Sequence, residues 1–161
     1  MILIKNGRVV DPVTNTDKIM DVLIKDNKIA EVSEHIEASG AQVIDAAGLV
    51  VAPGLVDTHV HFRDPGFTYK EDIETGARAA AKGGFTMVVC MANTKPAVDN
   101  IETLDYIQKK GEKTSINVLQ TATVTKGLKG TELVDMEQLA ASGAAGFTDD
   151  GIPIMDEKVL L

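Results

Sequence analysis

Two histidines in the first half of the chain have the spacing of a metal-binding pair. His59 and His61 stand two residues apart at the end of the apolar run Leu55–Val60. If that run is a strand, its alternation of faces turns both imidazoles to the same side, where they could share one ion. Neutral imidazole is a common ligand for zinc and other divalent metals. The spacing alone is equally compatible with two histidines in ordinary polar contacts.

Two more side chains near this pair could take part in its chemistry. Asp57 falls on the same face of the expected strand and could orient a histidine from outside the metal shell. Arg63 follows His61 by two residues and carries a planar guanidinium that can bind a carboxylate through two hydrogen bonds. A surface salt bridge is an equally good interpretation of Arg63 from spacing alone.

Polar residues also follow later apolar runs. Asn93 comes after the run at residues 86–91, and its amide can donate to a carboxylate oxygen. Asp149 and Asp150 come after the apolar segment 145–147 and could supply a carboxylate to a metal. Taken alone, both patterns favour turns exposed to solvent.

The chain after residue 52 alternates apolar runs with helical patterns, which is typical of βαβ units and a parallel sheet. We expect strands at residues 55–60, 86–91, 116–121 and 145–147, and helices at 70–82, 101–110, 132–141 and, as a beginning, 156–161. Asp99-Asn100 should cap the helix at 101–110. A (β/α)8 barrel needs about 250 residues, so residues 53–161 would supply its first half. An open doubly wound sheet is the alternative, but no Gly-x-Gly-x-x-Gly follows the first strand.

Residues 1–52 have a different pattern of short apolar runs separated by turn residues. We expect half-buried antiparallel strands, with a tight hairpin at Asn6-Gly7 and further turns at Asp26-Asn27 and Ala47-Gly48. This region would form a small β-unit, part of a β-sandwich domain. The sequence therefore predicts an α/β protein with two regions, residues 1–52 and residues 53–161.

Composition excludes several classes of function. The net charge of −8 argues against a nucleic-acid surface or an anionic membrane surface, because both attract clustered Lys and Arg. No stretch of eighteen apolar residues occurs, so we expect a cytoplasmic protein. Cys90 is the single cysteine and lies in an apolar run, where we expect a small core residue.

Longer motifs connect these residues to a known family. Residues 53–66 read PGLVDTHVHFRDPG, residues 83–86 read GGFT and residues 91–96 read MANTKP. The first motif resembles the metal-binding strand of dihydroorotases, including the Phe-Arg-(Asp/Glu)-Pro-Gly that follows the histidines. The resemblance covers essentially the whole chain, including the β-unit that precedes the barrel in the amidohydrolase superfamily. It implies the amino-terminal part of a (β/α)8 TIM-type barrel of a metal-dependent hydrolase.

The resemblance also implies a role for each candidate residue. His59 and His61 would bind the more buried metal, while Arg63 and Asn93 would hold the carboxylate of the substrate. Many members of the superfamily place a carboxylated lysine after the fourth strand to bridge two metals, but residues 146–151 contain no lysine. This segment is similar to the bacterial branch in which an aspartate bridges, and we assign that position to Asp150, with Asp149 as the less favoured choice.

The implied reaction is the reversible cyclisation of N-carbamoyl-L-aspartate to L-dihydroorotate in pyrimidine (UMP) biosynthesis. In the hydrolytic direction, hydroxide activated by zinc, with two ions in a complete site, would attack the ring amide. The general acid/base aspartate and two further metal histidines are expected beyond residue 161. We therefore expect the chain alone to be inactive.

Two other interpretations stay open. Another cyclic amidase, such as hydantoinase or allantoinase, would share the barrel and the histidines, although Arg63 and Asn93 favour a substrate with a carboxylate. A non-catalytic scaffold for aspartate transcarbamoylase is the alternative from a different class, but a scaffold has no need of His59 or His61. The resemblance is compatible with a homo-oligomer and does not fix the metal's identity.

Overall fold

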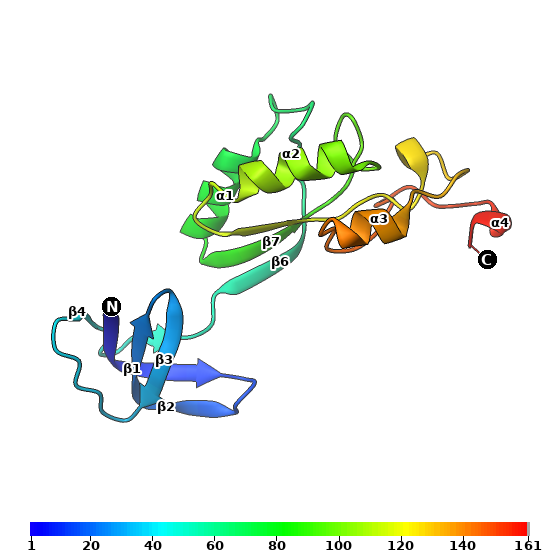
Figure 1. Cartoon of the computed structure of the whole chain (residues 1–161). Coiled ribbons are helices and arrows are strands. Elements are labelled where there is room, and N and C mark those ends of the chain that lie inside the picture. Colours follow the sequence, from blue (N-terminus) through cyan, green and yellow to red (C-terminus); the bar gives the residue numbers. More distant parts are fainter. Residues whose placement is uncertain (161) are drawn as a thin grey trace. The chain divides into compact units, whose positions relative to one another are not determined.

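The computed structural model of this chain describes residues 1–160 and is drawn in Figure 1. The chain divides into two compact units, Met1–Pro53 and Gly54–Leu161. No helix within residues 1–160 combines the length and the hydropathy that crossing a membrane requires.

The first unit is a mixed β-sheet. Its strands are β1 (Ile2–Asp11), β2 (Thr16–Lys25), β3 (Lys28–Ser33), β4 (Gln42–Asp45) and β5 (Val50–Val51). The order is β3-β2-β1-β4, with β5 also paired to β1. The pairs β1–β2 and β2–β3 are antiparallel as expected, whereas β4 and β5 run parallel to β1. The expectation of a purely antiparallel unit was therefore wrong.

Two of the three turns expected in this unit are present. At Ala47-Gly48 the chain turns, and Leu49 N donates to Ala46 O at 2.9 Å. Asp26 and Asn27 connect β2 to β3 with positive φ angles of 51° and 58°, which a tight hairpin turn requires. The hairpin expected at Asn6-Gly7 is wrong, because β1 continues through these residues with a shift in register. Asn6 has a φ of 62°, and its N–H donates to the buried carboxylate of Asp21 at 2.9 Å. Asp21 thus holds a bulge where the dipeptide suggested a chain reversal.

The second unit alternates strands and helices. Its elements are β6 (Leu55–Val60), α1 (Ile73–Lys82), β7 (Phe85–Cys90), α2 (Ile101–Gly111), β8 (Asn117–Gln120), the 3-10 turn η1 (Lys126–Leu128), α3 (Met136–Ala141) and α4 (Glu157–Leu160). In the described residues the sheet has the order β6-β7-β8, with both pairs parallel. Helices α1 and α2 lie together over one side of this sheet (Figure 1). The three strands expected at residues 55–60, 86–91 and 116–121 are confirmed to within a residue at each end.

The fourth expected strand, residues 145–147, is reduced to a single bridge between Ala122 and Phe147. Three backbone hydrogen bonds still align this segment with the end of β8: Ala145 N to Gln120 O, Ala122 N to Gly146 O, and Thr148 N to Ala122 O, at 2.8, 2.9 and 2.9 Å. The segment therefore continues the parallel order, but it is too short to form a regular ladder.

Capping side chains explain where the helices begin. Asn100 caps α2 as expected, accepting from Thr103 N at 2.9 Å. The first helix begins at Ile73 rather than at residue 70, because Asp72 accepts from Thr75 N at 2.8 Å. The third begins at Met136 rather than at residue 132, since Asp135 is its cap.

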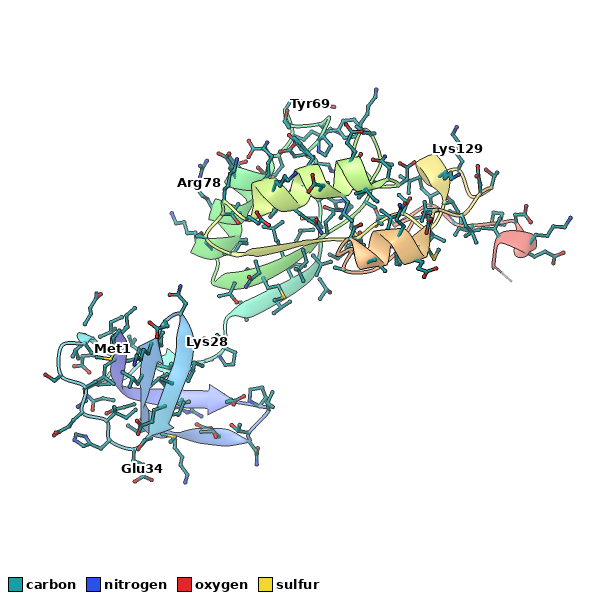
Figure 2. The ribbon with its side chains drawn as sticks, in the orientation of Figure 1. Met1, Lys28, Glu34, Tyr69, Arg78 and Lys129 are labelled. Atoms are coloured by element: carbon teal, nitrogen blue, oxygen red, sulfur yellow. The ribbon has the colours of Figure 1, made fainter. Side chains whose placement is uncertain are left out.

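The core lies between the sheet and the inward faces of the helices. Figure 2 shows Arg78 pointing outward from α1, while Ile73, Gly76 and Ala77 are buried on the opposite face. The other buried members of the core cluster are Phe62, Val88, Cys90, Ala92, Val98, Leu104, Ile107, Ala122, Val134 and Leu139. Burial raises the pKa of the Cys90 thiol to about 12, so this cysteine is a small core residue as expected.

The loop after β6 is anchored to α2. The Asp64 side chain is fully buried and accepts from the hydroxyl of Tyr106 at 3.1 Å and from Lys110 Nζ at 2.7 Å. Tyr106 and Lys110 are four residues apart and therefore share one face of the helix. The loop also packs on the loop after β7, because Lys95 N donates to Pro65 O at 3.0 Å and Gly66 lies against the backbone of Lys95. The two loops thus form one connected structure.

Gly76 provides the first test of this packing. A Cβ at position 76 would lie 2.4 Å from Cδ1 of the buried Phe62 ring. Helix propensity alone favours alanine by about 1 kcal/mol, but we expect Gly76→Ala to lower the free energy of unfolding by about 1–3 kcal/mol through overpacking. Chemical denaturation measures this change. In a Phe62→Leu background, Gly76→Ala should lower the free energy of unfolding by less. An equal loss of unfolding free energy in both backgrounds would contradict the contact between residue 76 and the Phe62 ring.

Lys110 provides the second test. Lys110→Met leaves the Asp64 carboxylate buried without its cation, so we expect a loss of about 3 kcal/mol in unfolding free energy. The hydrogen bond from Lys110 to Asp64 raises the pKa of the lysine, so this contribution is complete below the ordinary lysine pKa of 10.5 and is lost as the pH rises through the higher folded-state value.

The neighbouring Lys109 is a matched control for that substitution. It pairs with Asp105 at 2.5 Å on the exposed side of α2, and Lys109→Met should change stability by no more than about 0.5 kcal/mol. Similar losses for the two lysine variants would show that the buried pair does not hold the loop.

Candidate metal centre

Three side chains from two distant parts of the chain meet at the carboxyl end of β6. One ligand atom from each of His59, His61 and Asp150 lies within 4.8 Å of the others. His59 Nε2 is 3.0 Å from Asp150 Oδ1, and His61 Nε2 is 3.8 Å from Asp150 Oδ2. These three residues were predicted from the sequence to act together, and the fold brings them together.

The strand geometry explains the placement of the two histidines. His59 belongs to β6 and His61 follows the end of that strand, so the alternation of faces turns both to one side. Their ring centroids are 5.3 Å apart, and the rings are inclined at 67°. Asp57 accepts from the backbone N–H of His59 at 3.0 Å. Asp57 therefore stabilises the backbone at the end of the strand. The sequence had suggested that it would contact an imidazole ring instead.

The two neighbouring aspartates have different environments. Asp149 is buried and accepts from the backbone of Val124 at 2.8 Å, from the backbone of Thr125 at 3.1 Å and from the Thr125 hydroxyl. These bonds occupy its carboxylate in holding two loops together. Asp150 adopts a positive φ of 54°, which turns its side chain toward the histidines. The geometry thus favours Asp150 over Asp149 as a metal ligand.

Arg63 and Asn93 lie beside these three residues. Asn93 follows β7, and its Nδ2 donates to Asp150 Oδ2 at 2.5 Å. Its Oδ1 is 2.9 Å from His61 Nδ1 and 3.5 Å from Arg63 Nη1. Arg63 is part-buried and has a φ of 60°, a conformation that L residues rarely adopt. The anchoring of the next residue, Asp64, holds Arg63 in this position.

Sequence reasoning missed the residues that support the site from α2. Tyr106 and Lys110 bind Asp64 in the loop that carries Arg63. Their spacing of four residues on a helix was the available signal, but this spacing is common and does not identify the partner. The contact between Asn93 and the histidine pair was missed as well, since no local pattern connects residues 32 positions apart.

The donor set fits a divalent metal. Two imidazole nitrogens and one carboxylate oxygen are ligands that zinc accepts in catalytic sites, which have three protein ligands and one open position. The same set suits several other divalent ions. The cluster is partly exposed, with side-chain exposures of 59% for His59, 28% for His61 and 17% for Asp150, so an ion or a small substrate could reach it.

Comparisons with known proteins agree on the family. A family model described as Dihydro-orotase-like matches residues 48–160. The chain is 59% identical to the dihydroorotase of Clostridioides difficile and 54% identical to that of Streptococcus pneumoniae, over 100% and 99% of its length. It spans 38% of the length of each of these relatives.

Solved structures show the fold to which the chain belongs. An L-hydantoinase from Arthrobacter aurescens superposes with a TM-score of 0.81 at 26% identity, over 99% of this chain and 36% of that protein. A D-hydantoinase superposes with a TM-score of 0.75 at 30% identity, over the same shares of the two chains. The expected fold class, the amino-terminal part of an amidohydrolase barrel, is thereby confirmed. With the match over residues 48–160, the chain belongs to the dihydroorotase-like family.

Proposed function

We propose that this chain carries part of the active site of a dihydroorotase, which interconverts N-carbamoyl-L-aspartate and L-dihydroorotate. One observation carries the proposal: a guanidinium, Arg63, lies next to the cluster of metal-binding side chains, with Asn93 between them. A cyclic amide that bears a carboxylate needs both features, since the ring amide must reach the metal while the carboxylate needs a cationic partner. The relatives named dihydroorotase support this assignment.

His59, His61 and Asp150 would hold zinc, and in a complete site Asp150 would bridge two ions. Zinc would supply a water of lowered pKa and would polarise the ring carbonyl. The chain's own residues would contribute binding and orientation. Arg63 would fix the substrate carboxylate, and the partly exposed position of the cluster would leave the ring amide free to approach it.

The second hydrogen on Asn93 Nδ2 is available for the substrate. An amide nitrogen donates two hydrogen bonds, and Asp150 accepts one of them. The other can reach a carboxylate oxygen held by the neighbouring Arg63. We therefore propose that Arg63 and Asn93 bind the substrate carboxylate together.

A hydantoinase is the second candidate, favoured by the superposition on solved hydantoinases. The Arg63 guanidinium argues against it, because an unsubstituted hydantoin ring has no carboxylate to pair with this cation. A non-catalytic scaffold is less well supported still. It would not need imidazole and carboxylate groups arranged around one point.

The reaction tests the proposal directly. An enzyme of the relatives' full length that carries this chain should hydrolyse L-dihydroorotate, lose this activity after chelation and regain it with zinc. The decrease in ultraviolet absorbance that follows opening of the ring amide measures turnover. Unsubstituted hydantoin serves as the control substrate. Faster turnover of hydantoin would favour the other cyclic amidases, and failure to bind zinc or to hydrolyse either compound would favour the scaffold.

The two aspartates should separate metal binding from stability. Asp150→Asn removes the charged ligand but keeps a side chain that tolerates positive φ, so zinc affinity should fall at least about tenfold with little change in stability. Asp149→Asn weakens a buried acceptor of three hydrogen bonds and should reduce the unfolding free energy by about 1–3 kcal/mol. Zinc titration and denaturation of both variants test this, and a loss of zinc affinity only in Asp149→Asn would overturn the assignment.

A further inference from the structure

We infer that Asn93 is a positioning residue for the metal ligands as well as a contact for the substrate. Its amide lies between His61 and Asp150, two of the three residues that converge on the candidate metal position. A residue that served the substrate alone would have its polar atoms free to face that substrate. Here both ends of the amide are already bonded to the ligands. This inference rests on the proposed function only where it concerns the substrate.

The hydrogen bonds fix the orientation of the Asn93 amide. The Asp150 carboxylate has no hydrogen to donate when ionised, so the Asn93 atom 2.5 Å from it must be the NH2 group. The amide oxygen must then face His61. Arg63 supports this orientation, since its Nη1 can only donate and lies 3.5 Å from the same oxygen.

The amide orientation in turn fixes the His61 tautomer. Because Asn93 Oδ1 accepts, His61 Nδ1 must carry the hydrogen in the bond of 2.9 Å. In a neutral imidazole the other nitrogen, Nε2, then has a free lone pair, and it is this atom that faces the Asp150 carboxylate. Metal-binding histidines are commonly held in this way by an acceptor on the second ring nitrogen. Asn93 thus presents His61 Nε2 to the ion.

The loop around Asn93 is held in place by buried neighbours and backbone hydrogen bonds. Met91 and Ala92 are buried, and Met91 N donates to Val60 O of β6 at 2.9 Å. Val98 N and Thr94 N both donate to Ala92 O, at 3.1 and 3.0 Å, and close the loop on itself. The side chain therefore projects from a fixed backbone that is paired with the strand that carries His59.

A consequence is that Asn93 connects the candidate metal ligands to the groups proposed to bind the substrate carboxylate. Its oxygen contacts His61 and Arg63, while its nitrogen contacts Asp150 and retains one hydrogen for the substrate carboxylate. Arg63 has no such contact with a metal-binding residue among the hydrogen bonds of residues 1–160. Substitutions at Asn93 and at Arg63 should therefore differ in their effect on metal affinity.

The experiment compares zinc affinity in variants of a full-length enzyme that carries this chain. Asn93→Ala removes the acceptor for His61 and the donor for Asp150, so zinc affinity measured by competition with a chromophoric chelator should fall about 10- to 100-fold. Arg63→Met should leave zinc affinity unchanged and raise the KM for dihydroorotate. The visible spectrum of the Co²⁺ form should change in Asn93→Ala and stay as in the unaltered enzyme in Arg63→Met.

Asn93→Asp tests the assigned mechanism, because it keeps an acceptor for His61. It should bind zinc more tightly than Asn93→Ala, although a second carboxylate then replaces the donor to Asp150, and the added negative charge should raise the KM for a carboxylate substrate. Asn117→Ala is the matched control, since Asn117 lies exposed at the start of β8 and makes one bond of 3.3 Å to Thr86 O.

Two results would overturn the inference. Unchanged zinc affinity in both Asn93 variants would mean that Asn93 serves the substrate alone. Equal weakening in both would mean that it does not act through His61. The melting temperature of each variant, compared with Asn117→Ala, identifies losses that come from misfolding. If the unaltered enzyme binds zinc but does not hydrolyse dihydroorotate, the proposed function fails while the zinc comparison still decides the role of Asn93.

Discussion

In a parallel sheet all strands end at the same edge, and this constraint places every candidate functional group of the chain. His59 and His61 stand at the end of β6, Asn93 follows β7, and Asp150 follows the segment aligned with β8. Asn93 and Asp150 are 57 residues apart in sequence, yet their side chains are hydrogen-bonded. No local spacing could produce this contact. The helices α1 and α2 matter to the site because they cover one face of this sheet and bury Val88 and Cys90 of its central strand β7.

Arg63 and Asp150, the two candidate functional residues with a positive φ, each lie next to a buried aspartate. Arg63 and Asp150 both have positive φ, and such conformations in non-glycine residues are unfavourable by about 1–3 kcal/mol each. Asp64 follows Arg63 and is bonded to α2, while Asp149 precedes Asp150 and binds two backbone amides. In both loops the buried aspartate stabilises the fold, and its neighbour is held in a conformation it would not otherwise adopt. These separate roles explain why Asp149 and Asp150, which have the same side chain, have different environments.

The sequence was sufficient to predict the features that depend on local pattern. Apolar runs predicted strands β6, β7 and β8, and a capping residue predicted the start of helix α2. The alternation of side chains between the two faces of a strand placed His59 and His61 on one face. The errors have tertiary causes. Asn6-Gly7 has the composition of a hairpin, but the Asp21 carboxylate takes the Asn6 N–H and keeps β1 continuous as a bulge.

The candidate site could be predicted as a set of residues but not as a network. The choice between Asp149 and Asp150 depends on hydrogen bonds to Val124 and Thr125, which no spacing reveals. Asn93 was expected to face only the substrate, whereas its amide also lies between His61 and Asp150, two side chains of the candidate metal centre. Fold likeness does not resolve such details either, since hydantoinases share this arrangement of strands. Substrate choice must come from the side chains at the sheet edge. There the Arg63 guanidinium lies within reach of Asn93, so the group proposed to bind the substrate carboxylate is connected by a hydrogen bond to the residue inferred to orient His61.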